Sequence, residues 1–120
     1  METAEEVLTD YMTVDGEYGK HRIPGTEDWV IVASEGEWDY SWTMFKAFYS
    51  PSARRFFWHG DSGCSCNSWS DDLTSSESFE NGDRDALLRA WETFAKDRNW
   101  AYSIEEYQKG ISHIREFEVK

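Results

Sequence analysis

The sequence lacks any run of about 18 apolar residues, the length that a membrane-spanning helix needs. Its longest apolar stretch, residues 29–33, is far shorter. The N-terminal residues 1–6 are acidic and lack the basic start and apolar run of a signal peptide. These absences predict a soluble protein of the cytoplasm that has no membrane partner.

Basic residues are also scarce, with 12 Lys and Arg against 24 Asp and Glu and a net charge of −12. Residues 1–43 hold eleven acids and two bases, whereas residues 44–60 hold three bases and no acid. Nucleic-acid binding relies on cationic side chains that displace counterions, so no direct binding to DNA or RNA is expected. An acidic surface suits a basic partner instead, such as the nucleic-acid-binding surface of another protein.

Aromatic residues, by contrast, are abundant: the 120 residues include seven Trp, six Tyr and seven Phe, while aliphatic residues are comparatively scarce. A buried aromatic side chain removes roughly 150–250 Å² from water, so these rings make up most of the core of a single domain over residues 1–120. A chain of this size does not need so many rings for its core alone. Some are therefore expected to lie half exposed at an interface.

Local patterns predict the order of the elements. Thr3 and Glu6 form a capping box before a short helix at about residues 4–12, and the polar, Gly-rich residues 15–28 predict a loop. Residues 29–60 alternate in hydrophobicity between turn signals, which predicts a three-stranded antiparallel meander. On its middle strand, one parity carries the larger side chains and is expected to face the core: Tyr40, Trp42, Met44 and Phe48, with Lys46 reaching the edge of that face.

A cysteine loop over residues 61–82 and a helical part over residues 83–115 follow the meander. Asp83 is placed to cap a helix at about residues 84–97, and Ser103 with Glu106 opens a second helix. Gly110 in that second helix costs about 1 kcal/mol relative to Ala, so the helix is predicted to end there. The expected fold is α+β: a three-stranded antiparallel meander packed against two C-terminal helices, with a short N-terminal helix.

Both cysteines lie within Asp61-Ser62-Gly63-Cys64-Ser65-Cys66-Asn67-Ser68-Trp69. A structural zinc site needs four ligands, normally from two ligand pairs. Here His59, Cys64 and Cys66 supply three, and the fourth would have to be Asp61 or the distant His113. This zinc site stays open as an alternative.

The same two cysteines also have redox interpretations. A disulfide between Cys64 and Cys66 would close a very small, easily reduced ring, and free thiols are expected in an acidic cytosolic protein. Catalysis would need a cationic neighbour that stabilises the thiolate. His59 is the only nearby candidate for this cation, and the negative charge of Asp61 opposes formation of the thiolate. The sequence therefore favours a protein that is not an enzyme.

A recognition role is compatible with a structured loop, because loops displayed on a rigid sheet commonly carry binding function. The candidate binding residues lie in the first turn of the meander and in the cysteine loop: Trp38, Asp39, Tyr40, Asp61, Cys64, Cys66 and Trp69.

The order of features over residues 29–73 resembles a small domain of unknown function found in tailed phages of actinobacteria. The resemblance rests on a tryptophan-led strand, Asp39-Tyr40-Ser41-Trp42, Phe57-Trp58 and, most specifically, Asp-Ser-Gly-Cys-Ser-Cys at residues 61–66. The Ser-Pro-Phe-Glu-like segment of that family is replaced here by residues 68–71. The resemblance implies a phage origin and no particular reaction.

Three hypotheses follow. The first is a non-enzymatic, acidic phage accessory protein that binds a host protein in the bacterial cytoplasm and occupies its nucleic-acid-binding surface. The second is a small zinc-binding domain that uses His59, Cys64 and Cys66. The third is an enzyme of unassigned chemistry, suggested only by the closeness of cysteine and histidine in the sequence.

Overall fold

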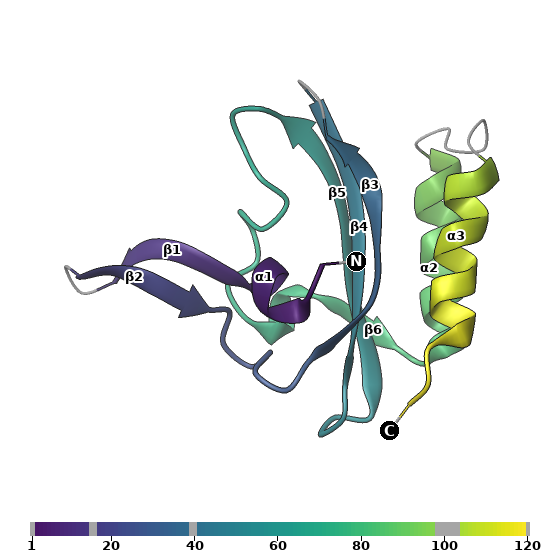
Figure 1. Ribbon diagram of the computed structural model, residues 1–120, viewed down its shortest axis with the longest axis horizontal. Helices are drawn as coiled ribbons and strands as arrows, with labels where there is room; N and C mark the ends of the chain where they lie inside the picture. Colours follow the sequence, from purple (N-terminus) through teal and green to yellow (C-terminus); the bar gives the residue numbers. More distant parts are fainter. Residues whose placement is uncertain (1, 15–16, 39–40, 98–103, 120) are drawn as a thin grey trace.

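The computed structural model describes residues 2–14, 17–38, 41–97 and 104–119. A four-stranded antiparallel sheet forms the middle layer, with two long helices on one face and N-terminal and loop segments on the other (Figure 1). The expected α+β class is confirmed, whereas the prediction of three strands is wrong because a fourth, short strand completes the sheet. None of the described helices is long and apolar enough to cross a membrane.

The sheet has the strand order β3-β4-β5-β6. Its strands are β3 (Val30–Trp38), β4 (Ser41–Ser50), β5 (Arg55–Cys64) and β6 (Glu80–Gly82). β5 pairs with β4 from Arg55 to Cys64, whereas β6 covers only residues 56–58 on its other side. Residues 61–64 therefore belong to a strand rather than to the predicted loop, because they continue the pairing with β4.

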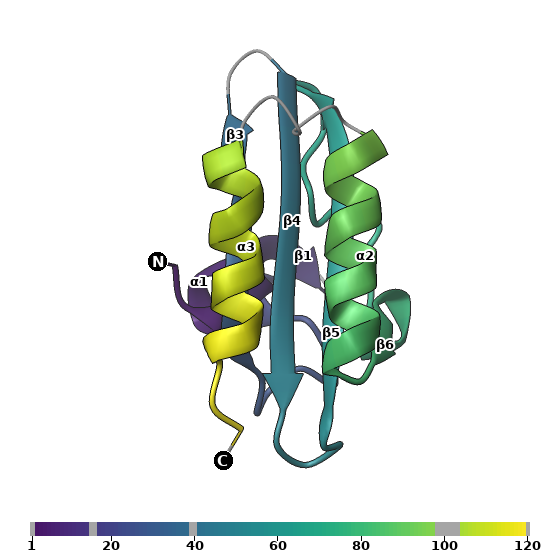
Figure 2. The ribbon, with the colours of Figure 1, turned by 90° about the vertical axis from the view of Figure 1, so that its right-hand side faces the viewer.

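Two helices, α2 (Arg84–Asp97) and α3 (Ile104–Glu116), lie side by side across one face of the sheet (Figure 2). Asp83 caps α2 as predicted, since its Oδ1 accepts a hydrogen bond of 2.8 Å from the Ala86 N–H. The predicted cap at Ser103 lies outside the described residues. α3 does not end at Gly110: this glycine is buried where the helix passes close to the indole of Trp91.

Both faces of the sheet are buried, so the expectation of a single core-facing parity on β4 is wrong. The helices cover the odd-numbered residues of β4, which join side chains of β5, α2 and α3 in a first core. This core includes Phe45, Ala47, Tyr49, Phe56, Trp58, Leu87, Trp91, Phe94 and Ile114.

The even-numbered residues Trp42 and Phe48 face a second core on the opposite side of the sheet. Residues from the N-terminal segment and from the chain after β5 complete it: Ala4, Leu8, Ile23, Trp29, Trp69, Leu73 and Phe79. Lys46 lies on this face but does not reach the edge. It is only 8% exposed, and its ammonium contacts Glu2 and the Ser34 hydroxyl.

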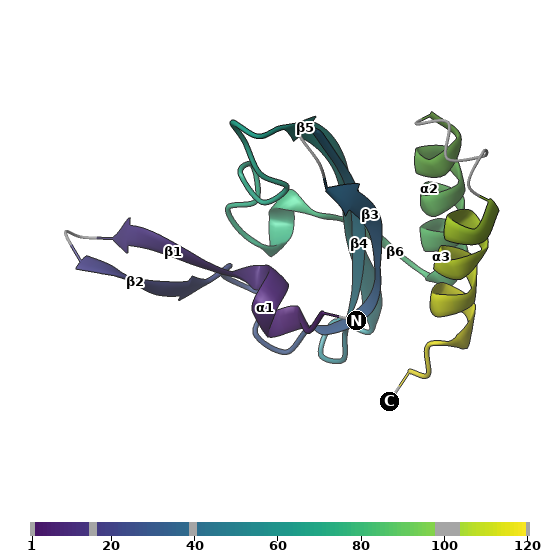
Figure 3. The ribbon, with the colours of Figure 1, turned by 45° about the horizontal axis from the view of Figure 1, so that its top comes forward.

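The N-terminal segment begins with α1 (Ala4–Leu8), capped as predicted by Thr3, whose hydroxyl accepts a hydrogen bond of 3.1 Å from the Glu6 N–H. The helix ends earlier than expected, and residues predicted as helix and loop instead form a two-stranded hairpin of β1 (Thr9–Val14) and β2 (Glu17–Arg22). A bond of 2.9 Å from the Ile23 N–H to the Leu8 carbonyl closes its base. The hairpin projects away from the body of the domain (Figure 3).

Candidate functional site

The cysteine turn follows directly from the last residue of β5, and Trp42 on the neighbouring strand holds it in place. The indole N–H of Trp42 donates to two backbone carbonyls, those of Cys64 at 2.9 Å and Asn67 at 3.0 Å. The Asn67 side chain accepts from the Cys64 N–H at 3.0 Å, and the Asn67 N–H donates back to the Cys64 carbonyl at 3.2 Å. Gly63 leaves room for this arrangement, because a Cβ there would lie 2.4 Å from Asn67 Oδ1.

Cys64 and Cys66 form a disulfide across this turn, with their Cα atoms 5.4 Å apart. The expectation of free thiols is therefore wrong for this structure. The separation is possible because the chain turns at Ser65, which brings the two Cα atoms within the usual range for a disulfide. Both cysteines are exposed to solvent.

His59, the third proposed zinc ligand, lies on β5 against the second core, with its ring 5.3 Å from that of Trp69 in an edge-on arrangement. Its Nε2 is buried and has no hydrogen-bond partner among the described residues, while Oδ2 of Asp61 lies 3.8 Å away. Burial lowers the pKa of His59, and the nearby carboxylates of Asp61, Asp72 and Glu80 oppose that effect. The ring is therefore held neutral at neutral pH.

The described residues include no group of three or more His, Cys, Asp or Glu side chains placed to hold a metal ion. Thiolate ligation and a disulfide also exclude each other at the same sulfurs, so zinc binding would need the reduced turn. The remote candidate His113 lies on α3, on the other side of the sheet. It pairs there with Glu35. The structure therefore does not bring it to the cysteine turn.

The structure places three of the predicted binding residues, Asp61, Cys64 and Cys66, on the last part of β5 and the turn that follows it, and packs Trp69 against the sheet nearby. Asp61, Cys64 and Cys66 are at least partly accessible there, whereas Trp69 is only 6% exposed. The indole N–H of Trp69 donates to the His59 carbonyl at 3.0 Å, so this residue anchors the loop instead of offering its ring to a partner.

The remaining candidates are Trp38, Asp39 and Tyr40. Trp38 pairs with Trp42 at the end of β3, which places its backbone near the cysteine turn. Asp39 and Tyr40 lie outside the described residues, so their role stays a prediction.

A pair of a histidine and a buried glutamate, which sequence reasoning missed, joins β3 to α3. The carboxylate of Glu35 is 3% exposed and lies 2.5 Å from Nδ1 of His113. Burial raises the pKa of Glu35, the hydrogen bond from His113 opposes this, and the neighbouring carboxyl of Glu106 raises the pKa further. The two paired residues are 78 positions apart in the sequence, and no motif links them.

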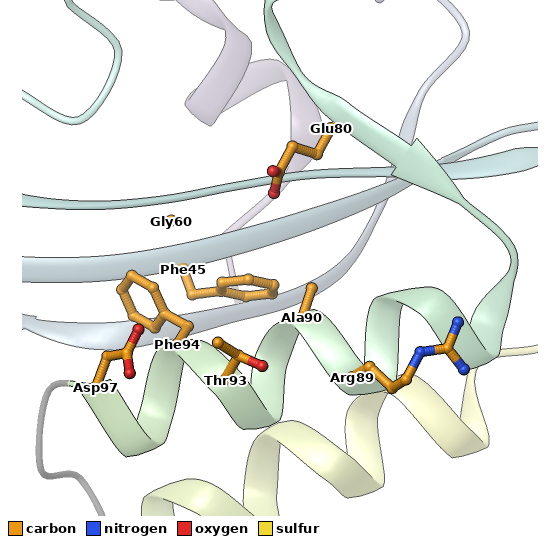
Figure 4. Close-up of a pocket in the computed structure, with 8 residues that line it drawn as sticks. All are labelled: Phe45, Gly60, Glu80, Arg89, Ala90, Thr93, Phe94 and Asp97. Carbon is orange, nitrogen blue, oxygen red and sulfur yellow. The ribbon is translucent and has the colours of Figure 1, made fainter.

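An open cleft of about 350 Å³ runs between β5 and α2 (Figure 4). Its apolar wall consists of Phe45 and Phe94 beside Gly60, and charged side chains of Glu80, Arg89 and Asp97 stand around it (Figure 4). Glu80 also accepts a hydrogen bond of 3.0 Å from the Trp58 indole. Its lining residues include no histidine or cysteine, so the cleft offers no imidazole base and no thiol nucleophile.

The net charge is concentrated in two segments. Residues 1–28 contain eight acids and two bases, and residues 61–83 contain six acids and no base, which together account for the full −12. The other residues balance, with ten acids and ten bases. We call these two segments the acidic layer. α1 lies on the sheet face opposite the helices, and the β1–β2 hairpin projects from that side (Figure 1), whereas Glu80 and Asp83 at the end of the second segment lie beside α2.

The two segments of the acidic layer touch each other directly. The Ser76 N–H donates to the Pro24 carbonyl at 2.8 Å, and side chains from both segments share the second core. Several of its carboxylates are exposed and have no salt bridge to a described residue: Glu5, Glu6, Glu27, Asp71, Asp72 and Glu77.

A family model described as "Domain of unknown function (DUF7574)" matches residues 27–120. The chain belongs to this family. The DUF7574 match includes the four-stranded sheet and both long helices but not α1, β1 or β2. It confirms the expected membership in a family of unknown function and reaches well beyond residues 29–73, while the phage origin stays a prediction. Neither the curated proteins nor the solved structures contain a match to the chain.

Proposed function

We propose that the protein is a non-enzymatic binding protein whose acidic layer docks onto a basic surface of another protein. The resemblance of the cysteine segment to phage domains extends this proposal. The protein would be a phage accessory protein, and its partner a host protein whose nucleic-acid-binding surface it occupies.

The separation of charge between the acidic layer and the helical part of the chain supports this proposal. All of the net charge of −12 belongs to the acidic layer, whereas residues 84–119, which include both long helices, hold seven acids and six bases. A charge distribution of this kind orients the molecule as it approaches a basic surface and raises the association rate. Acids added only for solubility have no reason to gather in two segments that pack against each other.

The described side chains also favour binding over catalysis. Cys64 and Cys66 are joined to each other, and Nε2 of His59 has no hydrogen-bond partner among the described residues. His113 is engaged with a glutamate that is 3% exposed and out of reach of a substrate. Among the described residues, no accessible thiol is therefore paired with a histidine base.

Affinity capture from host lysate in 50 mM and 500 mM salt tests the proposal. The screening length is about 14 Å at the lower and about 4 Å at the higher salt concentration, so a partner held by the acidic layer is captured well only at the lower one. A partner that binds equally at both concentrations would contradict the electrostatic mechanism.

Two sets of variants locate the interaction on the molecule. The first set neutralises exposed carboxylates of the acidic layer: Glu5→Gln, Glu27→Gln, Asp72→Asn and Glu77→Gln. The matched control set removes the same number of exposed charges from the helical side: Asp85→Asn, Glu105→Gln, Glu116→Gln and Glu118→Gln.

The first set is expected to weaken capture about tenfold at low salt, because an exposed charge pair contributes roughly 0.2–1 kcal/mol. It is also expected to flatten the salt dependence, whereas the control set leaves both unchanged. Equal losses in the two sets would show that net charge matters and the acidic layer does not.

A further inference from the structure

The Cys64–Cys66 disulfide is not what holds its turn together. Four hydrogen bonds among Trp42, Cys64 and Asn67 fix the backbone there, and none of them involves a sulfur atom. The disulfide closes a loop of only three residues, and a cross-link is expected to stabilise less the shorter the loop that it closes. A mainly structural role therefore does not explain this bond.

The bond is accessible, and its reduced form is preorganised to close again. Both cysteines are exposed. Because the hydrogen bonds keep the two Cα atoms about 5.4 Å apart, reduction leaves the thiols within reach of each other. Accessible disulfides that contribute little stability are typically the labile or catalytic ones.

The charge around the turn determines which thiols can approach. The segment over residues 61–83 has six acids and no base. The ammonium of Lys46 lies 5.8 Å from the centre of the Trp69 ring but is engaged by Glu2. An attacking thiolate that carries further negative charge is repelled at this site, whereas one that also carries an ammonium group is not.

We propose that Cys64 and Cys66 form a reversible thiol–disulfide exchange site that reacts preferentially with thiols free of additional negative charge. A thiolate attacks one sulfur of the disulfide and forms a mixed disulfide, while the other cysteine leaves as a thiolate and takes up a proton. A second thiolate attacks the external sulfur of the mixed disulfide and releases the second cysteine. Two external thiols are thus oxidised to one disulfide, and the protein gains two electrons and two protons.

Reduction rates of the oxidised protein, followed by intact mass, test the proposal with three probes: cysteamine, 2-mercaptoethanol and glutathione. Rate constants are expressed per thiolate and compared with those of a disulfide-closed Cys-Ser-Cys peptide. The ratio of the cysteamine rate to the glutathione rate is expected to be about fivefold higher for the protein than for the peptide at 20 mM salt, and to approach the peptide value at 500 mM.

Neutral variants show whether the neighbouring carboxylates cause this selectivity. With Asp61→Asn and Asp72→Asn combined, the ratio of the cysteamine rate to the glutathione rate at 20 mM salt is expected to be only about twofold higher than that of the peptide. The control pair Glu105→Gln and Glu116→Gln, on the far side of the sheet, is expected to leave this ratio of rates at the value of the unchanged protein.

Three results would overturn the proposal. The first is a selectivity at low salt equal to that of the peptide. The second is reduction that occurs only as fast as the whole domain unfolds. The third is a protein that keeps two free thiols after incubation with excess cystamine, because no reversible disulfide then exists.

Discussion

Replacing Gly110 with alanine tests how closely the two long helices approach each other. In a helix interior this substitution normally stabilises by about 1 kcal/mol, because glycine has the greater conformational freedom in the unfolded chain. Here a Cβ at residue 110 would lie 2.4 Å from Cε2, 2.6 Å from Cζ2 and 2.7 Å from Nε1 of Trp91. Helix propensity therefore predicts that Gly110→Ala raises the free energy of unfolding, whereas tertiary packing predicts that it lowers it.

Packing is expected to dominate because the Trp91 ring has no room to move. Its exposed fraction is 0%, its ring stacks against Tyr107, and its indole N–H donates to the Tyr107 carbonyl at 3.0 Å. Overpacking costs about 1–3 kcal/mol and loss of the hydrogen bond about 1 kcal/mol more. After the propensity gain is subtracted, Gly110→Ala is expected to destabilise the protein by about 2 kcal/mol.

Urea unfolding followed by circular dichroism measures this difference. Ser112→Ala, at an exposed position of the same helix, is the matched control and is expected to change stability by no more than about 0.5 kcal/mol. In a Trp91→Leu background the indole ring is absent, so the alanine at residue 110 is expected to be neutral or stabilising. An increase of about 1 kcal/mol in the free energy of unfolding from Gly110→Ala alone would refute the reasoning, because helix propensity would then outweigh the packing against Trp91.

Three further perturbations test other contacts. Because burial raises the pKa of Glu35 above its ordinary value of about 4.3, its contribution to stability is present below that pH and is lost as pH rises through the raised pKa. Glu35→Gln is therefore expected to gain melting temperature relative to the natural protein between pH 4 and 8, and a difference independent of pH would contradict this. Trp42→Phe removes the indole donor shared by two carbonyls, and thermal unfolding is expected to show a loss of about 1–2 kcal/mol; no loss would mean that the cysteine turn does not depend on it. Glu2→Gln leaves the buried Lys46 ammonium without its carboxylate, and the expected loss is about 1 kcal/mol because Glu2 itself is 44% exposed; an unchanged urea midpoint would show that this pair contributes nothing.

Features governed by neighbouring residues could be predicted from the sequence. The helix caps at Thr3 and Asp83 depend on a side chain and a backbone N–H within one turn, and both are present. The strands of the meander were also recognisable, because hydrophobic alternation and turn residues act locally.

Features that depend on distant partners could not be predicted. Residues 61–64 look like a loop because they are polar, and only pairing with β4 makes them a strand. The contact between Glu35 and His113 joins residues on separate elements that each look like ordinary surface positions in sequence. The alternation on β4 predicts one buried face, whereas this chain has enough aromatic residues to cover both faces of its sheet.

The second core has a consequence for where this domain begins. The family match starts at residue 27, yet Leu8 and Ile23 lie within the packing around Trp29 and Phe48. A fragment cut at the family boundary would keep every strand of the main sheet and still expose one of its apolar faces. For this protein, the unit that packs as one core is therefore larger than the unit that its family model matches, and a fragment that starts at residue 27 is expected to be less stable than the whole chain.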